Sequence, residues 1–210
     1  MGIENKEIKT AIVCGGVIND LEWLKENLAT FDYIIAADSG YDYCIKVNIS
    51  PNVLIGDFDS IKSNIPENTE IIKLPYKKDL TDFDVCLDYC LENGIKNVFV
   101  FGAWGGRPGH SFAAVFSGLS SFNKGLCVVF KNENNEMFFV NDYMEIPKSK
   151  NYISVFALGE TSPIVTLEGF EYPLENYLLE PCKPLGVSNR VSHEKGVIKI
   201  KGGIVLVIKE

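Results

Sequence analysis

The sequence predicts an α/β protein: an N-terminal domain built on an open, mostly parallel sheet, followed by a small all-β, sandwich-like domain. In the first part of the chain, apolar runs of strand length alternate with stretches of helical spacing, and polar or glycine-containing loops follow the runs directly. From Leu126 onward only short β-rich runs remain, separated by turn residues. We therefore expect two domains, spanning residues 1–147 and 148–210.

Each domain has a predicted series of elements. Strands of the first domain are expected at 8–14, 33–37, 53–55, 70–74 and 98–101. Helices are expected at 21–31, at 41–47, from a cap at Asp79 to a stop at Gly94, and at 110–122. Later strands are expected at 126–130, 137–140, 152–158, 164–167, 177–179, 197–200 and 204–208. The first strands after Leu126 are expected still to join the α/β sheet.

Composition excludes several classes of partner. A net charge of -8 argues against nucleic acid as the main partner. No apolar run approaches the roughly 18 residues that a membrane span needs, and the first residues lack the apolar core of a signal peptide. The six cysteines form no C-x-x-C pair, which argues against a zinc site. We expect a cytoplasmic protein with no membrane partner.

The stretch Gly56-Asp57-Phe58-Asp59-Ser60 follows an expected buried strand. Asp57 and Asp59 are two residues apart, so at a strand end both carboxylates can reach one hard cation such as Mg²⁺. Two alternatives stay open from these residues alone. The aspartates could satisfy local backbone N–H groups of a turn, or Asp57 could be a phosphatase nucleophile, although the adjacent Asp-Asp pair that such an enzyme needs later in the chain is absent from the sequence.

A second acidic stretch, Asp79-Leu80-Thr81-Asp82, lies about twenty residues later at an expected helix start. Asp79 and Asp82 are three residues apart and would share a helix face. This spacing is also typical of a helix cap. Capping does not explain the preceding Lys77-Lys78 pair, whereas ammonium groups beside carboxylates at a helix N-terminus suit a magnesium–polyphosphate.

The third candidate stretch runs from Gly102 to His110. Glycines after a strand let the backbone approach a phosphate closely, and Arg107, one of two arginines in the chain, adds a charged fork. The sequence contains neither G-x-x-x-x-G-K-[ST] nor G-x-G-x-x-G, so this is neither a Walker A loop nor a dinucleotide fingerprint. By itself, the later segment Gly186-Val187-Ser188-Asn189 reads as an ordinary turn.

Taken together and in order, these segments resemble the thiamin pyrophosphokinase family. The matching segments are Ala37-Asp38-Ser39-Gly40, PNVLIGDFDSI at 51–61, Lys78-Asp79-Leu80-Thr81-Asp82, Gly105-Gly106-Arg107 with His110, Glu168-Gly169-Phe170-Glu171-Tyr172-Pro173-Leu174, and Gly186-Val187-Ser188-Asn189. The resemblance implies a homodimer with thiamin sites between the subunits. It also implies a reaction in which ATP and thiamin give AMP and thiamin diphosphate.

The resemblance also implies roles for individual residues. Asp57, Asp59 and Asp82 would bind Mg²⁺ on the ATP triphosphate, with Asp79 and Arg107 completing the catalytic group. The nucleotide would lie against Asp38, Ser39, Gly40, Lys78, Thr81, Gly105, Gly106 and His110. Ser188 and Asn189 would hydrogen-bond the aminopyrimidine of thiamin.

One position departs from the family pattern. The family usually reads G-G-R-x-D-H, and here Gly109 replaces the aspartate, after Pro108. The loss of this carboxylate keeps open an alternative in which the protein binds nucleotide or thiamin but has lost turnover.

Overall fold

The computed structural model describes residues 8–67, 69–75 and 80–210. Contacts divide the chain into two compact units, Met1–Glu133 and Asn134–Glu210. Lys78 and Asp79, both expected site residues, lie outside the described residues. Among the described residues, no helix combines the length and the apolar character needed to cross a membrane.

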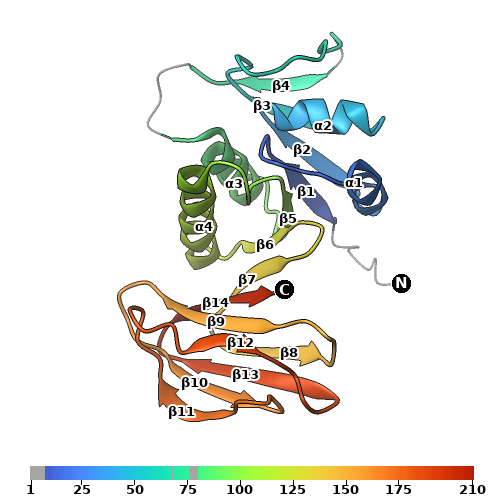
Figure 1. The fold of residues 1–210 in the computed structure, drawn as a ribbon. Helices are drawn as coiled ribbons and strands as arrows, with labels where there is room; N and C mark the ends of the chain where they lie inside the picture. Colours follow the sequence, from blue (N-terminus) through green and yellow to red (C-terminus); the bar gives the residue numbers. More distant parts are fainter. Residues whose placement is uncertain (1–7, 68, 76–79) are drawn as a thin grey trace, which may run out of the picture. The chain divides into compact units, whose positions relative to one another are not determined.

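The first unit is built on a parallel sheet with the strand order β6-β5-β1-β2-β3-β4 (Figure 1). Its strands are β1 (Thr10–Val13), β2 (Tyr33–Ala37), β3 (Val53–Gly56), β4 (Glu70–Lys73), β5 (Asn97–Phe101) and β6 (Cys127–Lys131). Ile12 of β1 is in register with Ile35 of β2 and Val100 of β5. These central strands are buried because apolar side chains occupy both of their faces.

Helices cover both faces of this sheet. They are α1 (Leu21–Leu28), α2 (Gly40–Lys46), α3 (Asp82–Glu92) and α4 (Pro108–Asn123). Leu24 of α1 and Cys44 of α2 belong to the same apolar cluster as Ala11 and Leu54 of the sheet. Figure 1 shows α3 and α4 together on the opposite face, where Phe83 contacts Phe130 with ring centroids 6.0 Å apart.

The strand order reverses at β1. From β1 the chain proceeds through β2, β3 and β4 toward one edge, and β5 and β6 then extend the sheet on the other side of β1. In open α/β sheets such a reversal, at the carboxyl ends of the strands, is where ligands bind. Here the loops after β1 and β5 touch: Gly16 N–H donates to the Gly102 carbonyl at 2.8 Å. A Cβ on Gly16 would lie 2.2 Å from that oxygen, so only glycine allows the contact.

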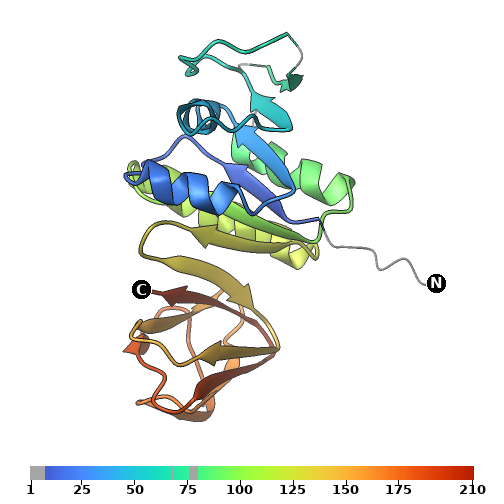
Figure 2. The same cartoon turned by 90° about the vertical axis from the view of Figure 1, so that its right-hand side faces the viewer.

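The second unit is an antiparallel β-sandwich (Figure 2). Its sheets have the orders β12-β9-β14-β7 and β11-β10-β13-β8. The strands are β7 (Glu136–Val140), β8 (Tyr143–Pro147), β9 (Ile153–Leu158), β10 (Ile164–Glu168), β11 (Leu174–Leu178), β12 (Gly186–Asn189), β13 (Lys195–Lys201) and β14 (Ile204–Lys209). Alternate residues of both sheets, such as Val155, Val207, Leu167 and Ile198, share one core.

The predicted fold class is confirmed, with local differences. Asp79 was expected to cap the third helix, and this is wrong: the N-cap is Thr81, in a reciprocal capping box with Asp84. Strands β8 and β12 were not predicted. Strand β12 is the Gly186–Asn189 segment, which by its sequence alone resembles an ordinary turn. Strand β7 pairs with β14 and β8 pairs with β13. The second compact unit therefore includes these two strands and starts at Asn134.

Candidate active site

Three aspartates converge at the carboxyl ends of β2 and β3. One carboxylate oxygen from each of Asp38, Asp57 and Asp59 can be chosen so that all lie within 4.8 Å of one another. We call these three residues the acidic cluster. Parallel strands end at the same edge of a sheet, which explains why residues about twenty positions apart meet here. Oxygen ligands at this spacing suit a hard divalent cation such as Mg²⁺.

The backbone around the acidic cluster adopts uncommon conformations. Asp38 has φ +45° and Phe58 has φ +69°, and such left-handed residues often accompany functional sites. The N–H of Asp38 donates to the carbonyl oxygen of Ile55 at 2.8 Å, which ties the end of β2 to β3. Asp57 Oδ1 accepts the N–H of Asp59 at 3.2 Å, and Asp59 Oδ1 accepts the Ser60 hydroxyl at 2.7 Å.

The electrostatics of the acidic cluster favour a bound cation. Asp38 Oδ1 is buried and has no hydrogen-bond partner among the described residues, which is costly for a carboxylate. Burial raises the pKa of Asp38, and the nearby charges of Asp82, Asp57 and Asp59 raise it further, although a backbone hydrogen bond from Ser39 opposes the shift. A divalent cation would satisfy the orphaned oxygen and neutralise the repulsion. The donor set therefore suits the metal that the sequence predicted, although the cluster contains Asp38 and not the expected Asp82.

A cavity of about 430 Å³ lies beside the acidic cluster. It is formed by the loops after β1, β2 and β5 and by the start of α3. The expected site residues that line it are Asp38, Ser39, Thr81, Asp82, Gly105, Gly106, Arg107 and His110. Gly15, Gly16, Tyr43 and Ser60 line it as well. Ser60 ends the candidate stretch after β3, and Gly15 and Gly16 lie in a glycine loop directly after a strand, whereas no sequence pattern had pointed to Tyr43. Gly40 is not among the lining residues; a Cβ there would lie 1.9 Å from the Val13 carbonyl oxygen, so this glycine permits α2 to pack on β1.

The N-terminus of α4 faces this cavity. Arg107 is the N-cap and makes no side-chain capping hydrogen bond, and Pro108 occupies the first turn. Gly105 and Gly106 have φ +98° and +78°, which glycine adopts readily. The Gly105 N–H donates to the Ser111 hydroxyl at 3.2 Å, which holds the loop against the helix. The positive end of a helix dipole and an arginine beside it form a site suited to phosphate oxygens.

The last two expected site residues lie in the second unit, on β12. Ser188 is exposed and has φ +57°, and its N–H donates to the Ser154 hydroxyl at 3.1 Å. Asn189 is 4% exposed, and its side chain bonds the backbone of Tyr172 and Arg190. A smaller cavity of about 220 Å³ adjoins β12. Most of its lining residues are apolar, and Tyr172 and Asn189 also line it.

Comparisons with known proteins point to one family. The family model "Thiamin pyrophosphokinase, catalytic domain" matches residues 24–130, and "Thiamin pyrophosphokinase, vitamin B1 binding domain" matches residues 143–205. The chain is 30% identical to the thiamine pyrophosphokinase of Bacillus subtilis over 207 residues, covering 94% of this chain and 96% of that relative. It is 25% identical to thiamin pyrophosphokinase 1 of Caenorhabditis elegans, covering 84% of this chain and 79% of the relative.

Solved structures show the same fold. The crystal structure of the Bacillus subtilis thiamine pyrophosphokinase superposes with a TM-score of 0.84 at 25% identity, covering 96% of this chain and 98% of that one. Thiamin pyrophosphokinase from Candida albicans has a TM-score of 0.77 at 18% identity, covering 97% and 89% of the two chains. Two family models in the expected order and a full-length relative lead to one conclusion: the chain belongs to the thiamin pyrophosphokinase family.

Proposed function

We propose that this chain transfers pyrophosphate from ATP to the hydroxyl group of thiamin in a Mg²⁺-dependent reaction, giving thiamin diphosphate and AMP. The observation that carries the proposal is the acidic cluster, with its orphaned Asp38 oxygen, beside a cavity of about 430 Å³. Arg107 and the start of α4, which suit phosphate binding, line the same cavity. Membership of the family supports the same reaction.

The roles of the residues follow from the chemistry of the transfer. The thiamin hydroxyl must attack the β-phosphorus of ATP while AMP leaves, so the protein must align the two reactants and offset charge. Asp38, Asp57 and Asp59, with Asp82, would hold Mg²⁺, which when bound neutralises triphosphate charge. Arg107 and the N-terminus of α4 would bind phosphate oxygens. Lys78 and Asp79, outside the described residues, keep the roles that the sequence suggests.

The nucleotide and thiamin would contact different parts of the chain. Ser39, Thr81, Gly105, Gly106 and His110 line the large cavity and would contact the nucleotide. Gly40 would act indirectly, by allowing α2 to pack closely on β1. Ser188, exposed on β12, would hydrogen-bond the aminopyrimidine of thiamin, and Asn189 would support that contact.

The test is a product assay. With Mg²⁺, ATP and thiamin, the protein should form AMP and thiamin diphosphate in equal amounts, and omission of thiamin should stop AMP formation. ADP as the sole nucleotide product would contradict the proposal, because it would indicate transfer of a single phosphoryl group. Phosphate release from phosphomonoesters without an acceptor would support the phosphatase alternative.

A second candidate function rests on Gly109, where the family usually has aspartate. In this alternative the protein binds nucleotide or thiamin without turnover. It predicts that thiamin raises the thermal unfolding temperature although no AMP is formed. The same product assay, run beside a thermal-shift measurement, distinguishes the two functions.

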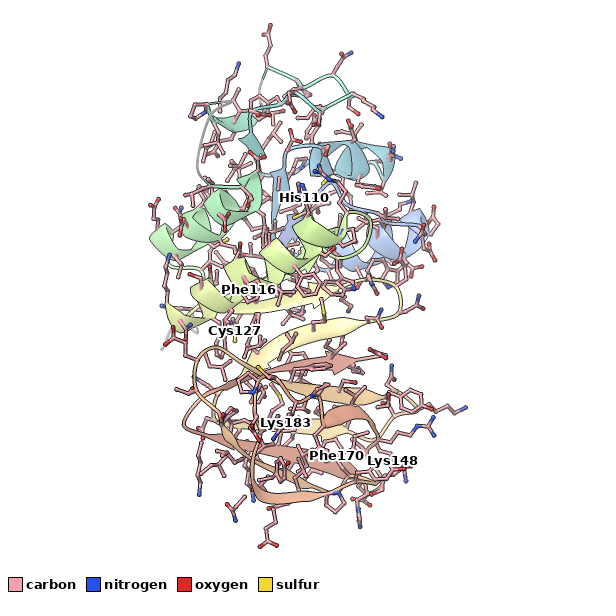
Figure 3. All side chains as sticks on the ribbon, turned by 60° about the vertical axis from the view of Figure 1, so that its left-hand side comes forward. His110, Phe116, Cys127, Lys148, Phe170 and Lys183 are labelled. Carbon is pink, nitrogen blue, oxygen red and sulfur yellow. The ribbon has the colours of Figure 1, made fainter. Side chains whose placement is uncertain are left out.

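We also propose that the protein acts in the cytoplasm as a homodimer with thiamin sites between subunits. Supporting self-association, α4 exposes two aromatic side chains four residues apart, Phe112 at 63% and Phe116 at 59%. Figure 3 shows Phe116 on this helix, with His110 near its start. Light scattering should give about twice the chain mass, and a monomer mass would contradict the dimer.

A further inference from the structure

Asp42 is a buried carboxylate that the proposed reaction does not use. It lies on α2 and is 8% exposed. Its Oδ1 accepts the N–H of Ser63 at 2.8 Å, and the N–H of Lys62 lies 3.1 Å from Oδ2 and 3.2 Å from Oδ1. Burial alone would raise the pKa of Asp42, but hydrogen bonds from the Ser63 hydroxyl and from both N–H groups outweigh burial and lower it. The side chain is therefore a charged anchor for a stretch of backbone.

The anchored backbone is the loop that carries two members of the acidic cluster. The loop leaves β3 at Gly56, bears Asp57 and Asp59, and reaches Lys62 and Ser63 within four residues of Asp59. These residues belong to no helix or strand. Regular backbone pairing therefore does not hold the loop in place, and side-chain contacts must do so.

Asp42 also belongs to the segment that carries Asp38, the third residue of the acidic cluster. Asp38 directly follows β2, Ser39 is the N-cap residue of α2, and Asp42 lies in the first turn of that helix. A rigid helical turn thus links Asp38 to the anchor, and the anchor holds the loop of Asp57 and Asp59. A second α2 contact, from the Tyr41 hydroxyl to the Asn64 carbonyl at 3.3 Å, reaches the loop further along.

We propose that Asp42 is a positioning residue for the acidic cluster: it fixes the loop of Asp57 and Asp59 at the separation from Asp38 that a shared divalent cation requires. Asp42 is not one of the carboxylates that meet in the acidic cluster, and its oxygens accept the N–H groups of Lys62 and Ser63, so it is not itself a metal ligand. The inference rests on the proposed function only for the presence of the cation. Partners that orient metal ligands in this way typically change metal affinity by about 10- to 100-fold when they are replaced.

The carboxylate form of this side chain matters because all of its partners are donors. In Asp42→Asn one oxygen becomes an NH₂ group, which faces N–H groups and cannot accept their hydrogen bonds. The loop of Asp57 and Asp59 should keep its backbone path, but its position relative to Asp38 should vary more. A matched control is Asp32→Asn: Asp32 also accepts a backbone N–H, from Lys9 at 3.1 Å, but lies at the opposite end of β2 from Asp38.

The experiment measures Mn²⁺ binding by electron paramagnetic resonance, with the non-cleavable α,β-methylene analogue of ATP present and thiamin absent. We expect Asp42→Asn to weaken Mn²⁺ binding about tenfold or more, and Asp32→Asn to match the unmodified protein. In the product assay, the Mg²⁺ concentration for half-maximal AMP formation should rise similarly, while the rate at saturating Mg²⁺ stays close to that of the unmodified protein. A merely structural loss would lower that saturating rate instead.

Binding by Asp42→Asn equal to that of the unmodified protein would overturn the role of Asp42 and leave the proposed function intact. Failure of the unmodified protein to bind Mn²⁺ would overturn the metal site itself, and the role of Asp42 with it. If Asp42→Asn does not fold, Ser63→Ala removes only the hydroxyl donor to Asp42. It should weaken Mn²⁺ binding in the same direction by a smaller factor, and unchanged binding in that variant would overturn the proposal.

Discussion

The side chain of Asn189 forms a two-point contact with the backbone of Tyr172. Its Oδ1 accepts the Tyr172 N–H at 3.0 Å, and its Nδ2 donates to the Tyr172 carbonyl at 2.7 Å. Oδ1 also accepts the N–H of Arg190 at 2.9 Å. The amide thus joins β12 to the segment before β11 and acts within the fold, while the neighbouring Ser188 is exposed.

Asn189→Ala should destabilise the protein. The substitution removes the part-buried hydrogen bonds to the N–H and carbonyl groups of Tyr172, and leaving such groups unsatisfied costs about 1–3 kcal/mol. Urea unfolding followed by circular dichroism measures the loss of unfolding free energy. Ser188→Ala is the matched control, since an exposed hydroxyl should change stability by less than about 0.5 kcal/mol. Equal stability of both variants would contradict the structural role of Asn189.

Ser188→Ala should instead act on the substrate. If the exposed hydroxyl binds the aminopyrimidine, its removal raises the KM for thiamin by about five- to tenfold, the value of roughly one hydrogen bond. The KM for ATP should not change. Steady-state AMP formation with each substrate varied measures both constants, and an unchanged KM for thiamin would remove Ser188 from the thiamin site.

The sequence could not separate the roles of these two neighbours. It identifies the Gly186–Asn189 segment only by resemblance, and the segment reads locally as a turn. Strand β12 forms because β9 supplies its partner: Gly186 pairs with Val155 and Asn189 with Ile153. A partner so distant in the chain leaves no local signal, in contrast to the strands of the first unit, where continuous apolar runs predict burial on both faces.

Asp38→Asn should stabilise the metal-free protein at neutral pH. The raised pKa of Asp38, caused first by burial and then by nearby carboxylates, means that the folded state keeps this proton to higher pH than the unfolded state. Stability of the metal-free protein is therefore lost as pH rises from 3.8, the ordinary value, through the folded-state pKa. Removing the charge removes this loss, so the variant should melt at a higher temperature at pH 7.

Two controls accompany that measurement, both made by thermal unfolding. Below pH 3.8 the carboxyl is protonated in both states, so the difference between variant and unmodified protein should disappear. Added Mg²⁺ should stabilise the unmodified protein and have little effect on Asp38→Asn. A lower melting temperature for the metal-free variant at pH 7 would contradict the repulsion described at this site.

The acidic cluster was predicted in part. Asp57 and Asp59 were expected at a strand end because they follow an apolar run at a spacing of two. Asp38 also follows an apolar run directly, and that signal could have assigned it to the metal rather than to the nucleotide. Its approach to Asp57 depends on Gly56, where a Cβ would lie 3.1 Å from the Cα of Asp38. Such closeness between two loops depends on sheet register, which the sequence does not display.

Asp57→Asn and Asp82→Asn should each lower AMP formation by more than about 100-fold while leaving the fold intact, because metal ligands stabilise charge that develops during transfer. Circular dichroism should show unchanged secondary structure, since Asp57 and Asp82 are half-buried and lie outside the apolar core. Asp32→Asn is the control and should keep full activity. Near-normal rates in Asp57→Asn and Asp82→Asn would exclude these carboxylates from the metal site.

Gly109→Asp should be tolerated at the position where this chain departs from its family. A Cβ there would meet no atom within 4 Å among the described residues, and its backbone does not have a positive φ. The first turn of α4 holds no acidic residue, so a new carboxylate should gain about 0.3–1 kcal/mol from the helix dipole. Urea unfolding measures this gain.

Gly105→Ala is the matched comparison, because a Cβ there also meets no atom within 4 Å among the described residues, but φ is +98°. The two sites therefore differ in backbone conformation and not in available space. We expect Gly105→Ala to lose about 1–2 kcal/mol, the cost of placing a side chain on a left-handed residue. If both variants unfolded at lower urea concentration than the unmodified protein, the α4 start would need a glycine at position 109 too. The family aspartate could then not simply be restored in this chain.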